Sequence, residues 1–404
     1  MIKICIIGGG ASGMLAAISA AREGASVTLF EKNDRLGKKI LSTGNGKCNY
    51  TNEVMNASFY HSSTENGFIA DVLSRFSEQD TIHFFEGLGI VPKVRMHGLY
   101  PNSETAVSIV DALRLEMENL GIKVYTGCGK VKVDKNEKSF IVRGESFDRC
   151  IVAVGGKAAP KTGSDGDGYF IAKKFGIDVV DALPALVPLK SDANWLKEVS
   201  GVRAASELSL YINNKFIHKS IGELQLTDYG ISGICTFELS SEASKAIAQG
   251  KKCFIYINFL PDHTKEEVFE LLQKRAEVLK KRSMAEFFIG LFNSKLSNVF
   301  IKKCGIKAET SVEKLTDKQL MGLADAITAL YVPIIDTCGF DKAQTTSGGI
   351  SLNELNKNFE SCKVPGLYFI GEVTDVDGIC GGYNLQWAWA GGFIAGKAAA
   401  NDKD

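Results

Sequence analysis

The sequence predicts an α/β protein in which a parallel sheet forms one domain and a segment of different character is inserted into that domain. Three observations carry the prediction. An apolar run at residues 2–7 leads through a glycine-rich turn into a helical pattern, and α/β character returns only near residues 366–371. The third observation is the change between them, where alternating strands and then capped helices begin near residue 188.

The composition is that of an ordinary globular protein. The chain has 404 residues, of which 45% are hydrophobic and 23% charged, so two or three domains are expected. Lys and Arg number 47, as do Asp and Glu. A net charge of zero predicts no nucleic-acid partner, because phosphate binding needs a cationic surplus. The 10 cysteines are scattered and no apolar run reaches about 18 residues, so we expect reduced thiols, no membrane span and a cytoplasmic location.

The first element is a strand followed by a glycine-rich turn. Residues 2–7 do not alternate in polarity, which is typical of a strand buried on both faces. Gly8, Gly10 and Gly13 then fit the pattern G-x-G-x-x-G, and a helical spacing of apolar residues follows. In this pattern the first glycine makes the turn, the second lets backbone approach a pyrophosphate, and the third lets the helix pack on the sheet.

The second strand, expected at residues 25–31, ends in an acidic side chain. Glu31 follows Gly13 by 18 residues. A carboxylate at this place accepts hydrogen bonds from an adenosine ribose and repels the 2′-phosphate of NADP. The βαβ unit therefore predicts a dinucleotide site.

A loop rich in glycine, asparagine and lysine follows at residues 35–52. Lys39 and Lys47 are candidates to neutralise a pyrophosphate. The small residues and amides at 42–46 allow the backbone to pass close to a planar ring. Later elements of this part are expected at residues 66–88 and 104–120 (helices) and 122–154 (a strand meander).

The inserted segment begins with strands and continues with helices. Alternation at residues 208–212, followed by Asn213-Asn214, predicts a hairpin. Capping boxes at residues 264–267 and 316–319 predict helices. An aromatic patch in the helical part either packs its core or forms a hydrophobic wall for a substrate. Its members are Phe287, Phe288, Leu291 and Phe292.

Two longer motifs are more specific than the glycine turn. Residues 38–52 read KKILSTGNGKCNYTN, and residues 371–392 read GEVTDVDGICGGYNLQWAWAGG. Both resemble the signatures of the YhiN-type, aminoacetone-oxidase-like FAD flavoproteins, a family that includes BaiN-like NAD(P)/FAD-dependent oxidoreductases acting on dehydro-bile acids. Further matches at residues 162–169, 226–233 and 346–350 extend the resemblance over nearly the whole chain.

The resemblance implies a Rossmann-like FAD-binding domain of the glutathione-reductase or fumarate-reductase-flavoprotein type, with an inserted β-barrel-like subdomain and a helical subdomain. The boundaries expected are residues 1–187 and 335–404 for the discontinuous FAD domain, 188–262 for the β-rich substrate subdomain and 263–334 for the helical subdomain.

The resemblance and the loop together assign residues to a non-covalent FAD. The glycine turn and Glu31 would hold the ADP half, Val131 the adenine, and the helix beginning near Asn384 the pyrimidine edge of the flavin, whose reduced anion its positive end would stabilise. The residues expected to bind the cofactor are Gly8, Gly10, Ala11, Ser12, Gly13, Glu31, Lys32, Lys39, Ser42, Thr43, Gly44, Asn45, Val131, Ala153, Val154, Gly155, Gly371, Glu372, Gly382, Tyr383, Asn384 and Leu385.

Reduction of a carbon–carbon double bond needs a hydride on one carbon and a proton on the other. Tyr229 and Tyr383 are the candidates to donate this proton or to orient the carbonyl group, and Asp228 and Arg203 are weaker candidates. Cys380 has no partner at C-x-x-C spacing, so we interpret it as a packing thiol. No histidine or cysteine spacing is typical of a metal site, so no metal is expected.

The function expected is an FAD-dependent oxidoreductase that uses NAD(P)H to reduce the C=C bond of a small, hydrophobic enone such as a 3-dehydro-bile acid or a steroid. The single dinucleotide turn means that NAD(P)H would visit the flavin transiently, or that electrons come from elsewhere. Two alternatives stay open: an O₂-using amine oxidase, and a non-catalytic flavin redox module or RNA-associated flavoprotein. The oligomeric state is not indicated.

Overall fold

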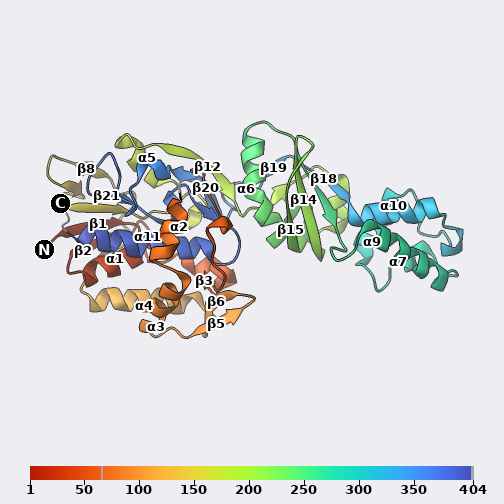
Figure 1. Ribbon diagram of the computed structural model, residues 1–404, viewed down its shortest axis with the longest axis horizontal. Coiled ribbons are helices and arrows are strands. Elements are labelled where there is room, and N and C mark those ends of the chain that lie inside the picture. Colours follow the sequence, from red (N-terminus) through yellow and green to blue (C-terminus); the bar gives the residue numbers. More distant parts are fainter. Residues whose placement is uncertain (65–66, 402–404) are drawn as a thin grey trace. The chain divides into compact units, whose positions relative to one another are not determined.

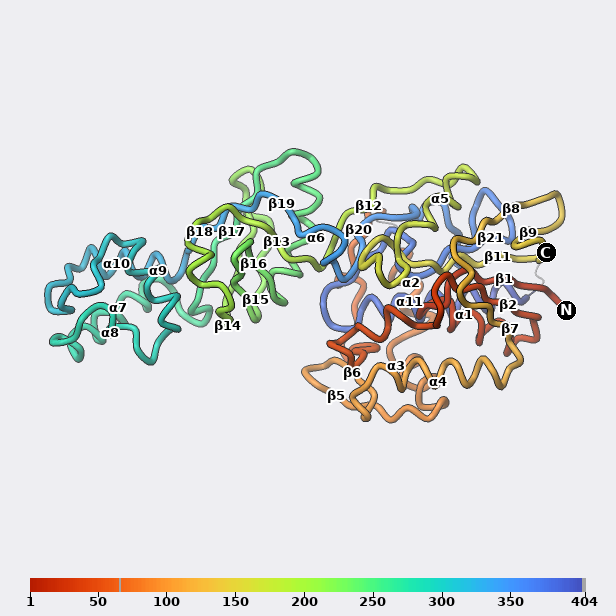
Figure 2. The backbone as a smooth tube through the Cα atoms, turned by 180° about the vertical axis from the view of Figure 1, so that it is seen from behind, coloured from red at the N-terminus to blue at the C-terminus, as the bar shows by residue number. Residues whose placement is uncertain are grey.

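The computed structural model describes residues 1–64 and 67–401 and divides into two compact units. The first unit comprises Met1–Ala185 and Ala343–Asp404, and the second comprises Leu186–Lys342. Each unit has its own hydrophobic core. Figures 1 and 2 show both units from opposite sides. The predicted separation of the insert into β-rich and helical subdomains stays a prediction, because both parts fall in the second unit.

The first unit is built on a five-stranded parallel sheet with the order β21-β11-β1-β2-β7. The central strand β1 (Lys3–Ile7) is almost wholly buried, as the lack of alternation predicted. The strands of the unit are β1, β2 (Ser26–Phe30), β3 (Thr51–Asn52), β4 (Tyr60–His61), β5 (Pro92–Arg95), β6 (Gly98–Pro101), β7 (Lys123–Tyr125), β8 (Val133–Lys135), β9 (Phe140–Val142), β10 (Glu145–Phe147), β11 (Arg149–Val152), β12 (Val179–Ala185), β20 (Thr345–Ile350), β21 (Leu367–Phe369) and β22 (Asp377–Gly378).

The segment expected as one helix at residues 66–88 forms two helices, because Ser77 caps a new helix with a capping box after the first has ended. The expected meander at residues 122–154 is also divided. Its outer strands β7 and β11 join the parallel sheet, whereas β8–β10 form a separate antiparallel sheet. The helices of the unit are α1 (Ala11–Arg22), α2 (Phe68–Arg75), α3 (Glu78–Gly87), α4 (Ala106–Asn119), α5 (Asp167–Lys174) and α11 (Tyr383–Ala400).

The first and last helices lie side by side and run in the same direction (Figure 1). A Cβ at Gly392 would lie 2.6 Å from the Ser12 carbonyl oxygen, and one at Gly396 would lie 2.5 Å from that of Ala16. Glycine is therefore required at both positions for the two backbones to approach this closely. As a result, the positive N-terminal ends of α1 and α11 point the same way.

The second unit contains a seven-stranded sheet with the order β18-β17-β14-β15-β16-β13-β19, in which all neighbouring strands are antiparallel. The hairpin predicted at Asn213-Asn214 joins β14 to β15. The elements are β13 (Leu189–Lys190), β14 (Arg203–Ile212), β15 (Lys215–Leu226), β16 (Gly230–Gly233), β17 (Cys253–Asn258), β18 (Leu330–Ile334), β19 (Asp336–Thr337), α6 (Ile234–Ala248), α7 (Lys265–Val278), α8 (Met284–Phe287), α9 (Ser294–Lys303) and α10 (Asp317–Thr328).

The aromatic patch of the helical part packs its core: Phe287 and Phe288 are buried, and Phe292 contacts Phe300 with ring centroids 5.2 Å apart. The ten cysteines all lie among the described residues, and no disulfide joins any of them. Among the residues described, every helix is too short or too polar to traverse a lipid bilayer.

Candidate cofactor site

In the glycine turn between β1 and α1, two glycines are required by the packing of the protein itself, and one is not. Gly8 has a φ of +107°, and a Cβ there would lie 2.5 Å from the Ala153 carbonyl oxygen. A Cβ at Gly13 would lie 1.9 Å from the carbonyl oxygen of Gly8. The fold itself therefore requires both glycines. Gly10 is different, because its φ is −84° and a Cβ there would meet no atom of the described residues within 4 Å.

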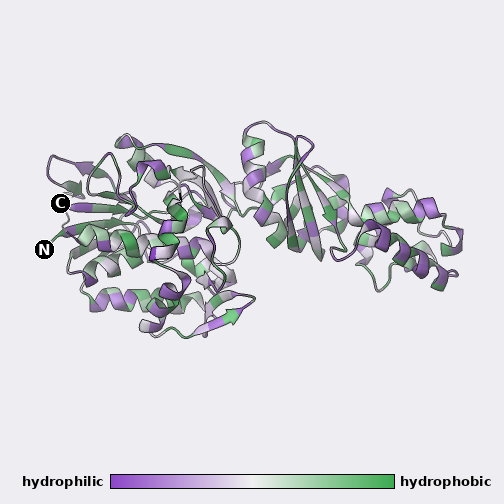
Figure 3. Cartoon of the chain, viewed as in Figure 1, coloured by the Kyte–Doolittle hydropathy of each residue, from purple (hydrophilic) through white to green (hydrophobic). Residues whose placement is uncertain are grey.

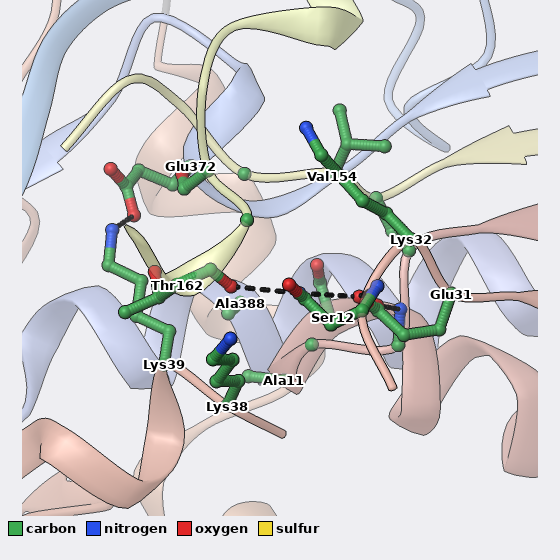
Figure 4. Close-up of a pocket in the computed structure, with 18 of the residues that line it drawn as sticks. Ala11, Ser12, Glu31, Lys32, Lys38, Lys39, Val154, Thr162, Glu372 and Ala388 are labelled. Atoms are coloured by element: carbon green, nitrogen blue, oxygen red, sulfur yellow. Dashed lines mark hydrogen bonds and ion pairs between the residues drawn. The ribbon is translucent and has the colours of Figure 1, made fainter. Parts of the chain in front are cut away.

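Gly10 lines a pocket of the first unit, and so do residues at the start of both parallel helices (Figure 4). Helix α1 begins at Ala11 and α11 begins at Tyr383, and neither has a side chain that caps its first turn. The N–H groups of a first turn have no partner inside their own helix and carry partial positive charge. The pocket therefore offers backbone donors to an anion at one helix and to a second electron-rich group at the other.

Glu31 lies at the end of β2, is 7% exposed and lines the pocket. Its Oε2 atom accepts a hydrogen bond of 2.6 Å from the Gly9 N–H, and its Oε1 atom accepts two of 2.7 Å from Asn33. A carboxylate has about four acceptor sites, so one remains for a ligand hydroxyl. The same side chain thus fixes the glycine turn and faces the ribose position that the sequence predicted.

Lys39 and Glu372 connect two distant segments at the other end of the pocket. The Nζ atom of Lys39 lies 2.5 Å from the Oε2 atom of Glu372 (Figure 4). The Oε1 atom of Glu372 accepts a hydrogen bond of 2.9 Å from the Thr346 hydroxyl, whose oxygen accepts bonds from the backbone N–H groups of Lys157 and Ala158. This network holds the glutamate side chain in one orientation at the pocket wall.

The two lysines expected near a pyrophosphate therefore have carboxylate partners. Lys47 pairs with Glu104 at 3.4 Å and does not line the pocket. Lys38, which the sequence reading left out, lines the pocket, and Figure 4 places its side chain beside Ala11. No ion pair involves Lys38 within the described part of the chain, so it is the lysine whose charge is available to a bound anion.

A cluster of charges borders the pocket near Val131. Lys32 contacts Asp165 at 2.5 Å and Asp167 at 2.8 Å, and Lys130 contacts Asp167 at 2.6 Å. Next to this cluster, Ser164 is buried and its hydroxyl has no hydrogen-bond partner among the residues described. A buried polar group without a partner is unfavourable, and a polar ligand in the pocket would satisfy it.

The pocket gathers most of the residues that the sequence predicted. The predicted residues that line it are Gly8, Gly10, Ala11, Ser12, Glu31, Lys32, Lys39, Thr43, Val131, Ala153, Val154, Gly155, Glu372, Asn384 and Leu385. Those that do not line it are Gly13, Ser42, Gly44, Asn45, Gly371, Gly382 and Tyr383. Several of these support the wall instead: a Cβ at Gly371 would lie 2.6 Å from the Ser12 hydroxyl oxygen.

Hydrogen bonds between side chains and nearby backbone groups shape the loop at residues 40–46 and the start of α11. Gly44 and Asn45 both have positive φ angles, and the hydroxyl of Ser42 donates to the carbonyl of Lys39. Asn384 exchanges two hydrogen bonds with the backbone of Gly378, at 2.9 and 2.8 Å. These contacts fix the two segments that approach the pocket from opposite ends of the sequence.

Other lining residues were missed by the sequence reading. They are Ile7, Gly9, Phe30, Asn33, Lys38, Ile40, Gly129, Thr162, Gly163, Ser164, Asp167, Ile171, Gln344 and Ala388. Residues 162–169 form one of the motifs that carry the family resemblance, and the sequence alone gives that motif no role. Gly129 and Gln344 lie outside any motif, and only the fold brings them to the pocket.

The candidate proton donors lie in different places. Tyr383 is 6% exposed, and its hydroxyl donates a bond of 3.2 Å to the Val54 carbonyl. Tyr229 belongs to the second unit and is 42% exposed, as part of a turn between β15 and β16. Burial, and then the charge of Cys338, raises the pKa of Tyr229, so its phenol stays protonated at neutral pH. Arg203 is paired with Glu223 at 2.9 Å.

A comparison with protein families agrees with this geometry. The features concerned are the glycine turn, the two helix starts and the free acceptor site of Glu31. The family model described as "HI0933-like protein Rossmann domain" matches residues 2–398. The chain belongs to this family. It is 39% identical to a 3-dehydro-bile acid delta(4,6)-reductase of Clostridium scindens, over 99% of each chain. It is 30% identical to a ribosomal RNA dihydrouridine synthase of Haemophilus influenzae, over 96% of each chain.

Among solved structures, the chain is similar to a flavocytochrome c3 fumarate reductase in its open conformation. The TM-score is 0.48 at 18% identity, over 99% of this chain and 78% of that one. The family membership makes the protein an FAD-dependent oxidoreductase with a Rossmann-type cofactor domain. The residues present fit that cofactor, since Gly10 leaves space on the pocket side and the Ser164 hydroxyl has no hydrogen-bond partner in the described part of the chain.

Proposed function

We propose that this protein reduces a carbon–carbon double bond conjugated to a carbonyl group, with NAD(P)H as the transient electron donor. The observation that carries the proposal is the pocket in which Gly10 and the starts of α1 and α11 face the same space. The two relatives support the reaction class. A delta(4,6)-reductase of a 3-dehydro-bile acid and a dihydrouridine synthase both hydrogenate a C=C bond conjugated to a carbonyl.

Bound FAD supplies the transfer of hydride between donor and acceptor. In the proposed arrangement the first turn of α1 and Lys38 hold the pyrophosphate, and the remaining acceptor site of Glu31 holds the ribose. The Lys39–Glu372 pair, fixed by Thr346, orients the ribitol side of the pocket. The first turn of α11 would present backbone N–H groups to the pyrimidine edge of the flavin, and its partial positive charge would favour negative charge there.

A proton donor is required for the second carbon of the substrate. We retain Tyr229 and Tyr383 as candidates. The hydroxyl of Tyr383 must first leave the Val54 carbonyl, whereas that of Tyr229 is half-exposed. Tyr229→Phe is therefore the first variant to compare, and loss of turnover with normal flavin reduction by NAD(P)H would support the role.

The experiment is an anaerobic one. The purified protein, loaded with FAD, is titrated with NADH and NADPH, and a panel of enone steroids and dehydro-bile acids is then added. Reoxidation of the flavin by an enone in the absence of O₂ is the expected result. The alternative of an O₂-using amine oxidase predicts flavin reduction by an amine and peroxide formation in air, and that result would overturn the proposal.

A second candidate substrate is a uridine base within RNA. Residues 271–314 contain ten Lys and Arg against four Glu, although the whole chain is neutral. Figure 3 shows hydrophilic residues, coloured purple, along helices α7 and α9. Backbone hydrogen bonds of 2.9 Å run from the Val312 N–H to the Arg282 carbonyl and from the Met284 N–H to the Thr310 carbonyl. These bonds bring the segments 280–282 and 307–314, which both carry lysine or arginine, close together. This local surplus is the charge pattern that phosphate binding needs.

A direct measurement distinguishes the two candidate substrates, the small enone and the uridine base. Uridine-containing ribosomal RNA, purified without this modification, is incubated with the reduced enzyme, and dihydrouridine is measured by mass spectrometry after nuclease digestion. Formation of dihydrouridine with no turnover of steroid enones favours the RNA substrate, and the converse result favours the small enone.

A further inference from the structure

The seven-stranded sheet of the second unit has two unlike faces. On one face Leu208, Leu210, Ile255 and Ile257 are buried in the core of the unit. The other face carries aromatic side chains on four neighbouring strands, and we name it the aromatic face. Its residues are Tyr211 on β14, Phe216 on β15, Phe254 and Tyr256 on β17, and Tyr331 on β18.

Strand register brings these rings together. Tyr211 stands opposite both Phe216 and Phe254, and Tyr256 stands opposite Tyr331. The rings of Tyr211 and Phe254 are stacked, with centroids 5.2 Å apart and planes at 5°. The ring centroids of Phe254 and Tyr331 are 5.3 Å apart. The aromatic face is therefore one continuous surface of touching rings.

Much of this surface is open to solvent. Phe216 is 48% exposed and Tyr331 is 45% exposed, and the other three rings are partly buried by one another. The solvent face of an antiparallel sheet ordinarily carries polar side chains. A contiguous apolar patch on such a face is typical of a binding surface.

Lysines stand at both ends of the aromatic face. Three exposed lysines lie at the end near the Asn213-Asn214 turn: Lys215, Lys251 and Lys252. None of them forms an ion pair with any of the described residues. At the other end Tyr331 lines a shallow cavity together with Trp195, Lys302 and Lys303. Trp195 adds a further ring beside the two lysines.

The carboxylates near the aromatic face are mostly neutralised. Glu207 pairs with Lys219 at 2.8 Å, and Glu198 pairs with Lys302 at 2.7 Å. Asp192 lies in the cavity as well, and Lys303 there has no ion-pair partner among the residues described. The surface therefore combines stacking rings with a surplus of positive charge.

We propose that the aromatic face binds single-stranded RNA, with bases stacked on Tyr331, Phe254 and Phe216 and phosphates contacted by Lys251, Lys252 and Lys303. Rings that accept the face of any base, flanked by lysines that follow the backbone, are the combination by which proteins hold unpaired nucleic acid. The proposal rests on the RNA candidate under the proposed function and assigns the surface that would capture that substrate.

The test measures binding of a fluorescein-labelled oligouridine by anisotropy to the full FAD-loaded chain. Tyr331→Ala and Phe216→Ala are expected to weaken binding about ten-fold each, as removal of one stacking ring does. Tyr331→Phe keeps the ring and is expected to bind normally. Phe170→Ala removes a ring that is 71% exposed on α5 of the other unit, and it is the matched control.

Charge is tested separately. Lys251→Glu with Lys252→Glu is expected to weaken binding and to lower the dependence of log Kd on log salt, while Lys173→Glu on α5 leaves both unchanged. Circular dichroism and flavin content identify any variant that fails to fold, and Phe216→Ser in the exposed hairpin is the replacement in that case.

Three results would overturn the proposal: wild-type chain that does not bind oligouridine, aromatic variants that bind as well as Phe170→Ala, or aromatic variants whose main change is loss of a dimer in light scattering. Reduction of small enones is measured in parallel. Normal enone reduction without RNA binding refutes only the proposal that the aromatic face binds RNA. RNA binding without any C=C reduction refutes only the proposed reaction.

Discussion

Gly10→Ala separates the requirements of the cofactor from those of the fold. The backbone at Gly10 has φ −84° and ψ −166°, which alanine adopts without strain, and the added Cβ meets no protein atom within 4 Å. The FAD-free protein should therefore keep its stability or gain about 0.4–1 kcal/mol, the usual effect of replacing glycine where the backbone permits it.

The cofactor should respond differently. The new methyl group stands where the pyrophosphate approaches the backbone, so one charge-assisted hydrogen bond worth about 1.5–3 kcal/mol is lost. The Kd for FAD should rise about 10- to 150-fold. Calorimetric titration of the FAD-free protein measures the affinity, and thermal unfolding of the same sample measures stability.

Two matched variants complete the comparison. Gly87→Ala, at the end of α3 with no atom near its Cβ, should leave FAD affinity unchanged. Gly13→Ala, whose Cβ would lie 1.9 Å from a carbonyl oxygen, should destabilise the FAD-free protein as well. Unchanged FAD affinity in Gly10→Ala, or a loss of stability equal to that of Gly13→Ala, would refute the reasoning.

Three further predictions follow from the contacts of single side chains. Glu31→Gln should weaken FAD binding about ten-fold, because an amide replaces one acceptor oxygen by a donor; FAD fluorescence titration measures it, and an unchanged Kd removes Glu31 from the ribose role. Lys39→Met leaves Glu372 without its cation and should lower the rate of flavin reduction more than the affinity for NAD(P)H, as stopped-flow absorbance would show; an effect on affinity alone would contradict a positioning role. Hydrogen bonding from Lys93, helped by Lys47 and Arg95, holds the pKa of Glu104 at about 2. This depressed pKa stabilises the fold above the ordinary pKa of about 4.5, and the contribution is lost as the pH falls towards 2, so the difference in urea midpoint between wild type and Glu104→Gln should be present at pH 7 and vanish near pH 2.

The sequence predicted the βαβ unit and its cofactor because the signals there are local. A strand without alternation, glycines at fixed spacing and an acid after the next strand each follow from contacts within about thirty residues. Gly371 and Glu372 required the family resemblance, since only the fold brings them to Ser12 and Lys39. No local signal distinguishes them from any other Gly-Glu pair.

The role of the lysines was the part that sequence reasoning placed least well. A lysine in a loop looks the same whether it faces a carboxylate or a ligand. Lys47 is predicted to lie at the pyrophosphate but pairs with Glu104, whereas Lys38, which the sequence motif includes without a binding role, lines the pocket. The net charge of zero likewise gives no sign of the excess of Lys and Arg at residues 271–314, because a total charge does not say where along the chain the charges lie.

The parallel pairing of α1 with α11 has a consequence for synthesis of the protein. One wall of the cofactor pocket is translated before residues 186–342 and the other after them, since Ser12 precedes that segment and Ala388 follows it. A ribosome must therefore pass both before flavin is captured, whereas residues 186–342 can assemble their own core much earlier.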